Sequence, residues 1–241
     1  MADKKAMVKH GTLFGVGVGP GDPELMTVKA WRLISMAPVV AYLAANGKES
    51  TASDIARPFI PDDCEHLVID MPMRTEREPG EKAYDFGAAA IAVHLKAGRD
   101  VVMLCEGDPF FYGSFMYIFA RLAKTYPTVV VPGVTSITAS AAAMGRPLSA
   151  RNEVVKILPA TLPEDRLREE LLTAESAAII KVGRHLPKIR NILGALDLTS
   201  RANVIIKATH EDERIEPLTD VTNDTLPYFS TILVYTGGEP W

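Results

Sequence analysis

Short β-branched runs alternate with helix-like stretches along this chain, and this alternation limits the fold more than any other feature of the sequence. Runs typical of strands lie at 12–18, 38–43, 66–69, 101–104 and 129–131. Helix-like stretches lie between them, near 24–36, 80–97 and 113–125. Strands and helices that alternate in this way are typical of a mostly parallel sheet covered by helices.

A second series of the same kind follows. Its strand-like runs lie at 154–158, 177–180, 204–206 and 232–235, and its helix-like stretches near 135–144, 163–173 and 186–196. Pro132 and Gly133 stand between the two series, and both residue types interrupt regular structure. We therefore predict two α/β domains with mostly parallel sheets, residues 1–131 and 132–241. The segments 70–80 and 208–228 are polar, which predicts irregular structure.

Composition excludes several classes of protein. Of the 241 residues, 47% are hydrophobic, which is ordinary for a globular chain. The sequence lacks both a secretory signal and the roughly 18 unbroken apolar residues of a membrane span, and it has two cysteines, so we expect a cytoplasmic protein without membrane attachment. The formal charge of −4 argues against nucleic-acid binding. The five histidines lack metal-ligand spacing, so no protein-bound metal is expected.

A glycine-rich segment at 15–24 lies where the first strand turns into a helix. Glycine allows positive φ and close approach of backbone, and a tight turn from strand to helix is the structural interpretation. Asp22 is a good N-cap, and Pro23 suits the first helical position. The dinucleotide fingerprint is not met, because Asp22 stands where its third glycine should be.

Two further segments follow later strands: Glu106–Ser114, which repeats the Gly-Asp-Pro sequence, and 132–138. Ligands in such folds bind outside the carboxyl ends of the strands, where small residues let them lie along the main chain. The alternative is purely structural: Asp108 as a turn residue, and Thr135 or Ser136 as a helix cap.

Taken together, the segments 17–27, 106–113 and 132–136 resemble the class III tetrapyrrole methyltransferases in order and spacing, across nearly the whole chain. Within that family, 107–117 is most similar to the enzymes that methylate carbon 20 of precorrin-2. The resemblance implies two α/β domains with an active-site trough between them, a homodimer, S-adenosyl-L-methionine as methyl donor and S-adenosyl-L-homocysteine as product.

The resemblance also assigns site residues by position. The cofactor-binding positions are Pro20, Glu106, Gly107, Asp108, Phe111, Tyr112, Thr135, Ser136, Val182, Ala208, Thr209, Ser230 and Thr231. At Lys181-Val182 the chain departs from the family's Tyr-Met, which leaves a backbone contact there.

A tetrapyrrole of this family carries many carboxylates, which predicts forked arginine contacts. The candidates are Arg74, Arg77, Arg146, Arg151 and Arg184, and for each one a solvated surface charge is the alternative. Methylation also releases a proton. Asp22 and Asp108 are the candidate acceptors, with structural capping as the alternative for both.

The sequence leaves other functions open. One alternative is a sister enzyme that methylates another ring position or that takes cobalt-precorrin-2. Another is a non-catalytic module that binds the tetrapyrrole or S-adenosylmethionine.

Overall fold

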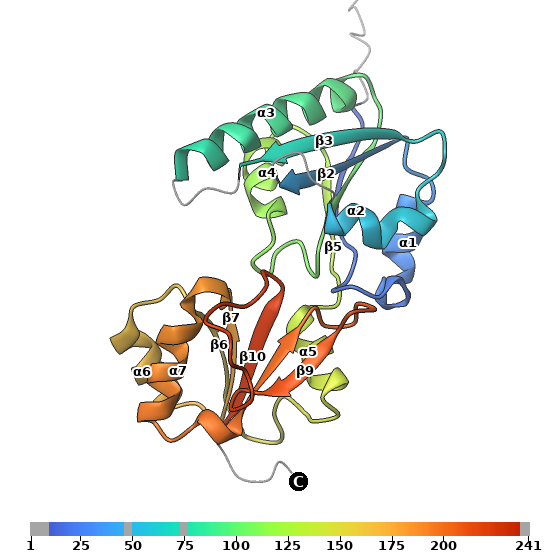
Figure 1. Cartoon of the computed structure of the whole chain (residues 1–241). Coiled ribbons are helices and arrows are strands. Elements are labelled where there is room, and N and C mark those ends of the chain that lie inside the picture. Colours follow the sequence, from blue (N-terminus) through green and yellow to red (C-terminus); the bar gives the residue numbers. More distant parts are fainter. Residues whose placement is uncertain (1–9, 46–49, 73–76, 237–241) are drawn as a thin grey trace, which may run out of the picture. The chain divides into compact units, whose positions relative to one another are not determined.

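The computed structural model describes residues 10–45, 50–72 and 77–236. The chain divides into two compact units, Met1–Thr135 and Ser136–Trp241 (Figure 1). The boundary expected from the sequence, between residues 131 and 132, lies in the same short connection, between a strand that ends at Val131 and a helix that begins at Ser136.

The first unit is built on a parallel sheet of five strands. They are β1 (Leu13–Gly17), β2 (Val39–Ala45), β3 (Glu65–Met71), β4 (Val101–Cys105) and β5 (Thr128–Val131). Their order is β3-β2-β4-β1-β5, and every neighbouring pair is parallel, which confirms the prediction for this unit. All five carboxyl ends therefore leave the same edge of the sheet.

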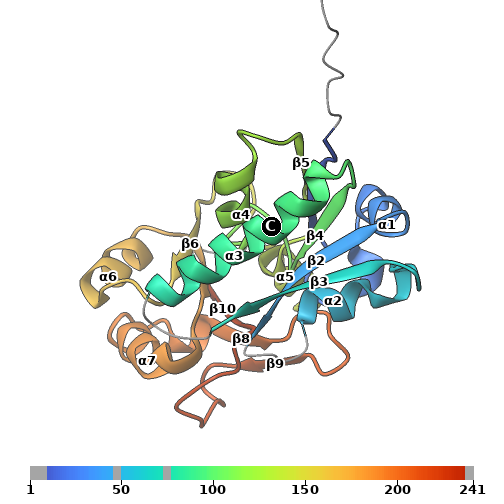
Figure 2. The ribbon, with the colours of Figure 1, turned by 90° about the horizontal axis from the view of Figure 1, so that it is seen from above.

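Helices cover both faces of this sheet (Figures 1 and 2). One face packs against α1 (Val28–Ile34) and α2 (Thr51–Ala56), and the other against α3 (Arg77–Lys96) and α4 (Phe115–Leu122). Alternate residues of β4 face the two layers: Val102 and Leu104 lie in the α1/α2 core, Val101 and Met103 in the α3/α4 core. Short 3-10 turns lie at η1 (Pro23–Leu25) and η2 (Arg57–Phe59).

Three local features differ from the sequence expectation. The helix predicted at 24–36 is divided into η1 and α1, because Thr27 caps α1 by accepting a hydrogen bond from the amide of Ala30 at 3.2 Å. The short helix α2 was not predicted; the Ser50 hydroxyl caps it. Helix α3 begins at Arg77, inside the segment 70–80 that was expected to be irregular.

The second unit also has a sheet of five strands. They are β6 (Val155–Pro159), β7 (Ser176–Ile180), β8 (Ala202–Ile206), β9 (Arg214–Pro217) and β10 (Ser230–Tyr235), in the order β6-β7-β10-β8-β9. The pair β6–β7 is parallel, whereas β10 is antiparallel to both β7 and β8, and β9 is antiparallel to β8. The prediction of a mostly parallel second sheet is therefore wrong. A parallel return needs a long crossover, usually a helix, and the connections from β8 through β9 to β10 contain no helix among the residues described there.

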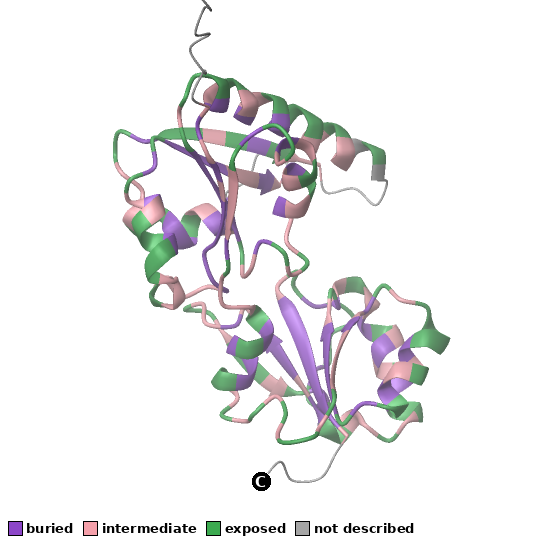
Figure 3. Cartoon of the chain, turned by 180° about the vertical axis from the view of Figure 1, so that it is seen from behind, coloured by how far each residue is buried: buried purple, intermediate pink, exposed green. Residues whose placement is uncertain are grey.

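Helices again cover both faces of the second sheet. Helices α6 (Glu164–Leu172) and α7 (Leu186–Ala195) lie on one face, and α5 (Ser136–Ala143) packs against β10 from the other (Figure 1). All six residues of β10 are buried, as Figure 3 shows in purple. Two 3-10 turns, η3 (Gly183–His185) and η4 (Thr199–Arg201), flank α7.

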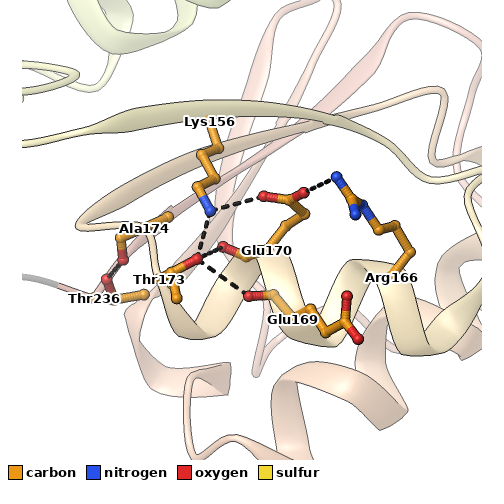
Figure 4. A network of polar contacts seen from close by, with 7 residues as sticks. All are labelled: Lys156, Arg166, Glu169, Glu170, Thr173, Ala174 and Thr236. Atoms are coloured by element: carbon orange, nitrogen blue, oxygen red, sulfur yellow. Dashed lines mark hydrogen bonds and ion pairs between the residues drawn. The ribbon is translucent and has the colours of Figure 1, made fainter.

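A polar network fastens α6 to β6 (Figure 4). The Lys156 Nζ donates to Glu170 Oε2 at 2.7 Å and to Thr173 Oγ1 at 2.5 Å. The other carboxylate oxygen of Glu170 pairs with Arg166. Both the strand and the end of the helix are thus held by one ammonium group.

Candidate active site

Three loops meet at the carboxyl edge of the first sheet, as the sequence predicted. Strand β1 lies between β4 and β5, so the loops that follow these strands leave the sheet side by side. Two of the loops are joined directly: the Gly107 amide donates to the Gly19 carbonyl at 2.8 Å. The motifs at 17–22, 106–114 and 132–135 therefore form one cluster, which we call the strand-tip cluster.

Glycines in the strand-tip cluster are required for contact between the loops. A Cβ atom on Gly133 would lie 2.0 Å from the Gly107 carbonyl oxygen, and one on Gly17 would lie 2.5 Å from the same oxygen. Gly107 itself has a φ of +62°, which favours glycine. Gly17 and Gly133 thus allow the close approach of backbone, since neighbouring main chain fills the space that a side chain would need.

Asp108 holds two of these loops together. Its Oδ1 accepts a hydrogen bond from the Phe110 amide at 2.9 Å, and its Oδ2 accepts one from the Gly133 amide at 3.0 Å. Asp22 accepts a hydrogen bond from the Glu24 amide at 2.8 Å and caps η1. These bonds give both aspartates the structural role that was weighed for them, and their role as proton acceptors stays a prediction.

Glu106 lies directly before the Gly-Asp-Pro sequence, and the pKa of its carboxyl is raised. Its Oε1 accepts a hydrogen bond from the Ala52 amide at 3.2 Å, in the first turn of α2. Desolvation by the surrounding protein raises the pKa of the carboxyl, and the backbone hydrogen bonds oppose that rise. The residue is nevertheless exposed by surface area. A carboxyl with dense surroundings that still reaches solvent is suited to exchange protons.

Two aromatic residues follow in the same loop. Phe111 and Tyr112 meet edge to face, with ring centroids 5.2 Å apart, and Tyr112 is 46% exposed. Tyr112 has a φ of +55°, an unusual conformation for a bulky residue. Backbone strain of this kind gathers at functional sites. Both rings are in the cluster, as the prediction that they wall the cofactor requires.

The remaining cofactor positions near this cluster are Pro20, Thr135 and Ser136. Pro20 is buried in the loop after β1, and Thr135 is half-buried at the end of the first unit. Ser136 is exposed and is the first residue of α5. The hydroxyls of Thr135 and Ser136 thus stand at a helix start, where they were expected.

In the second unit, three further predicted cofactor segments share one edge of the sheet. Strands β7 and β8 end there, and β10 begins there because it is antiparallel to both. The register pairs Ser230 with Ile206 and Ile232 with Ile179. Lys181-Val182, Ala208-Thr209 and Ser230-Thr231 are therefore brought together, although they are far apart in the sequence.

Side chains at this second edge turn mainly inward. Val182 is fully buried in the α6/α7 core, and Ala208 is buried as well. The Ser230 hydroxyl donates to the Pro227 carbonyl at 2.7 Å. Backbone groups are consequently what this edge presents at Val182 and Ala208. Lys181 and Thr209 have φ values of +57° and +67°, so both segments turn sharply as the strands end.

The structure separates the predicted substrate arginines. Arg184 lies in η3, just after the carboxyl end of β7. The Arg146 guanidinium lies 3.8 Å from the centroid of the Tyr235 ring, at the opposite end of β10 from Ser230. Arg151 lies before the amino end of β6, which is the same far edge.

Arg146 and Arg151 therefore lie at the opposite edge of the second sheet from its cofactor segments, and their contact with the substrate stays a prediction. Because β10 is antiparallel to β7 and β8, it begins at the edge where they end, and Tyr235 at its own end lies at the other edge. Arg74 lies outside the described residues, as does the side chain of Arg77.

Features of metal sites and of membrane spans are missing from the residues that the structure describes. Within the ranges 10–45, 50–72 and 77–236, no group of three or more His, Cys, Asp or Glu side chains could hold a metal ion. In the same part of the chain, none of the helices combines the length and apolar character that crossing a membrane requires.

Comparison with known proteins gives one family. The sequence model described as Tetrapyrrole (Corrin/Porphyrin) Methylases matches residues 12–221. A precorrin-2 C(20)-methyltransferase from Sinorhizobium sp. is 40% identical over 232 residues, which cover 93% of this chain and 95% of the relative. The cobalamin biosynthesis protein CobIJ from Mycobacterium tuberculosis is 43% identical over 236 residues. This chain spans 46% of the length of CobIJ, about half.

Solved structures agree on the fold. A cobalt precorrin-4 methyltransferase superposes with a TM-score of 0.72 at 24% identity, covering 93% of this chain and 94% of that one. A uroporphyrin-III C-methyltransferase from Thermus thermophilus, complexed with S-adenosylhomocysteine, superposes with a TM-score of 0.69 at 25% identity, covering 94% and 98%.

Proposed function

Because the chain belongs to the tetrapyrrole (corrin/porphyrin) methylases, we propose that it transfers a methyl group from S-adenosyl-L-methionine to carbon 20 of precorrin-2, in cobalamin biosynthesis. The observation that carries the proposal is the 40% identity to a precorrin-2 C(20)-methyltransferase over nearly the full length of both chains. The strand-tip cluster supports it, since the motifs of the resemblance meet at one sheet edge.

The methyl donor fits what the two sheet edges present. Each edge gathers predicted cofactor segments that are distant in sequence, and in each unit main-chain groups and small residues lie at the strand ends. Main-chain contacts of this kind suit an adenosyl ligand, which is bound by hydrogen bonds rather than by ion pairs. A Thermus relative of the same fold is described as complexed with S-adenosylhomocysteine.

Cationic side chains at the edge of the second sheet where β7 and β8 end are suited to bind the substrate. Arg184 is exposed there, and a guanidinium binds a carboxylate through two parallel hydrogen bonds. Desolvation lowers the pKa of neighbouring His185, and the positive charges of Lys188 and Arg184 lower it further. The local field is therefore positive, which favours the acetate and propionate groups of a tetrapyrrole.

The chemistry asks mainly for positioning. A sulfonium methyl group is already activated, so the chain needs to align the acceptor carbon with it and to keep water away. Asp108 and the glycines of the strand-tip cluster hold the loops in place for that task. Tyr112 offers a flat, half-exposed ring at the tip of the cluster.

Anaerobic incubation with labelled S-adenosylmethionine tests the function. We expect label to enter precorrin-2 and not uroporphyrinogen III. Label in uroporphyrinogen III alone would assign the chain to a sister activity. Tight binding of S-adenosylhomocysteine without any methyl transfer would instead favour a non-catalytic binding module.

One alternative substrate is supported by a specific observation. A cobalt-precorrin-2 C(20)-methyltransferase from Salmonella typhimurium is 29% identical over 228 residues. That identity is lower than the 40% to the precorrin-2 C(20)-methyltransferase, so precorrin-2 is favoured as the substrate. Competition between the two substrates in one reaction decides between them.

Assembly and location rest on the resemblance and are part of the proposal. It implies a homodimer that works in the cytoplasm. Light scattering from the purified protein tests the dimer, for which a monomer at micromolar concentration would be the contrary result.

A further inference from the structure

The proposed reaction leaves a proton without an assigned acceptor. The substrate carbon gains a methyl group and must lose its hydrogen as a proton to restore the conjugated ring. The sequence candidates, Asp22 and Asp108, also have structural roles: Asp22 caps η1, and both carboxylate oxygens of Asp108 accept hydrogen bonds from amides. Another group at the strand tips can receive that proton, and its assignment rests on the proposed function.

Glu106 stands where the strand-tip loops leave the sheet. It follows β4, on the face that packs against α1 and α2, because residues alternate along a strand and Val102 and Leu104 lie on that face. Its carboxylate reaches the first turn of α2 and accepts the Ala52 amide at 3.2 Å. One residue further on, the Gly107 carbonyl lies against Gly17 and Gly133. The carboxylate is thus held by the backbone of α2 beside the strand-tip cluster, and the residue is exposed.

The charged surroundings of Glu106 leave its carboxyl free to change protonation. On α2, Asp54 and Arg57 form an ion pair with each other. On its own segment, the Cys105 thiol is buried, and burial raises its pKa, so it stays protonated. Within the described ranges, no Lys, Arg or His nitrogen forms an ion pair with Glu106. Desolvation therefore raises the pKa of the carboxyl above its ordinary value, which makes the carboxylate a stronger proton acceptor.

We propose that the Glu106 carboxylate accepts the proton lost from the methylated carbon. The electron pair of the ring carbon forms the new bond to the methyl group, and the pair of the broken carbon–sulfur bond stays on sulfur. The proton then passes from that carbon to the Glu106 carboxylate, and the carbon–hydrogen pair returns to the conjugated ring. Glu106 becomes a neutral carboxylic acid and later releases its proton to water.

Glu106→Gln tests this proposal, since glutamine keeps the shape and an acceptor for the Ala52 amide but takes no proton. We expect the single-turnover rate of methyl transfer to precorrin-2 to fall by about 100-fold or more. The cofactor contact that the resemblance implies at Glu106 is made by the main chain, so the affinity for S-adenosylhomocysteine, measured by calorimetry, should fall far less than the rate. In the wild type the rate should rise with pH through the pKa of Glu106, because only the carboxylate accepts a proton; the variant should lack this rise. Glu106→Asp should recover part of the rate.

Two controls separate proton transfer from structure. Ser50→Ala removes the other side-chain cap of α2 and should leave the rate and the pH profile unchanged. Infrared titration of the unliganded wild type should show the band of a protonated carboxyl group that persists to higher pH than that of an ordinary glutamate. Glu106→Gln should lack this band. If the wild type transfers methyl and Glu106→Gln does so at the same rate and with the same pH profile, Glu106 is not the acceptor. If Ser50→Ala is equally slow, the role is structural. If the wild type transfers no methyl group to precorrin-2, the proposed function itself fails, and this assignment fails with it.

Discussion

At the scale of single residues, the strand-tip cluster depends on groups that hold loops together. Asp108 joins two loops through two amides, and Gly17 and Gly133 make room for the Gly107 carbonyl. These are the residues that make the family motifs recognisable in the sequence. Their structural contacts account for these residue types, and Glu106 and Tyr112 in the same loop are exposed.

Replacing Asp108 by Ala should damage binding and stability together. Two amides lose their acceptor, which costs about 1–3 kcal/mol of unfolding free energy. The affinity for S-adenosylhomocysteine should fall further than this loss of stability explains, because the displaced loop carries Gly107 and Tyr112. Urea unfolding and calorimetry measure the two effects, with Asp54→Ala, on the exposed side of α2, as the control. Unchanged affinity in a destabilised protein would separate the loop from the cofactor.

Two glycines offer a matched pair of alanine substitutions. A Cβ on Gly133 would meet the Gly107 carbonyl at 2.0 Å, so the loops must move apart, and we expect a cost of about 1–3 kcal/mol. Gly145 has a φ of +63°, and a Cβ added there would have nothing within 4 Å, so Gly145→Ala costs only backbone strain, about 1 kcal/mol. Chemical denaturation should rank Gly133→Ala as the less stable variant. The reverse order would mean that the loops yield easily.

At the scale of elements, each sheet gathers its predicted ligand segments by strand direction. In the first unit all strands are parallel, so the predicted ligand segments all follow carboxyl ends of strands and meet at one edge. In the second, the edge combines the ends of β7 and β8 with the beginning of β10. Elements away from that edge are held by polar contacts, such as the network between β6 and α6 in Figure 4.

The bond between Lys156 and Glu170 should make stability depend on pH. Hydrogen bonding from Lys156 lowers the pKa of Glu170 below its ordinary value, and the charge of Arg166 adds to this. A carboxyl with a depressed pKa in the folded state stabilises the fold above its unfolded pKa, about 4.3, and loses that effect as pH falls through the folded value. Glu170→Gln should therefore be less stable than the wild type at pH 7.

The same comparison at acidic pH completes that test. Below the folded pKa the difference in melting temperature between Glu170→Gln and the wild type should disappear. Glu169→Gln is the control, because Figure 4 shows the Glu169 carboxylate turned away from Lys156. A difference that persists unchanged in acid would show that the ion pair is not its source.

At the scale of the whole molecule, the two units have separate hydrophobic cores. The α6/α7 core belongs to the second unit, and the two cores on either side of the parallel sheet belong to the first. The predicted cofactor residues are divided between the units, with Gly107 and Asp108 in the first and Val182 and Thr209 in the second. We therefore expect S-adenosylhomocysteine to raise the stability of the chain.

S-adenosylhomocysteine should raise the stability of the whole chain by mass action. At a concentration of 100 times the dissociation constant, a ligand that binds only the folded state adds about 2.7 kcal/mol. Differential scanning calorimetry should show a rise in melting temperature with S-adenosylhomocysteine and none with NADH, whose glycine fingerprint the sequence lacks. A rise with NADH alone would contradict the proposed cofactor.

The sequence by itself determined the two α/β series, the parallel first sheet and the motifs at the strand ends. These follow from local patterns: hydrophobic periodicity, caps such as Asp22, and glycines at turns. Only the tertiary structure decided the direction of β10, the short elements α2 and β9, the separation of Arg146 from Arg184, and the use of Gly133 for packing between loops. Each of these depends on contacts between residues that are distant in sequence, and no local pattern records which strand or loop a segment will meet.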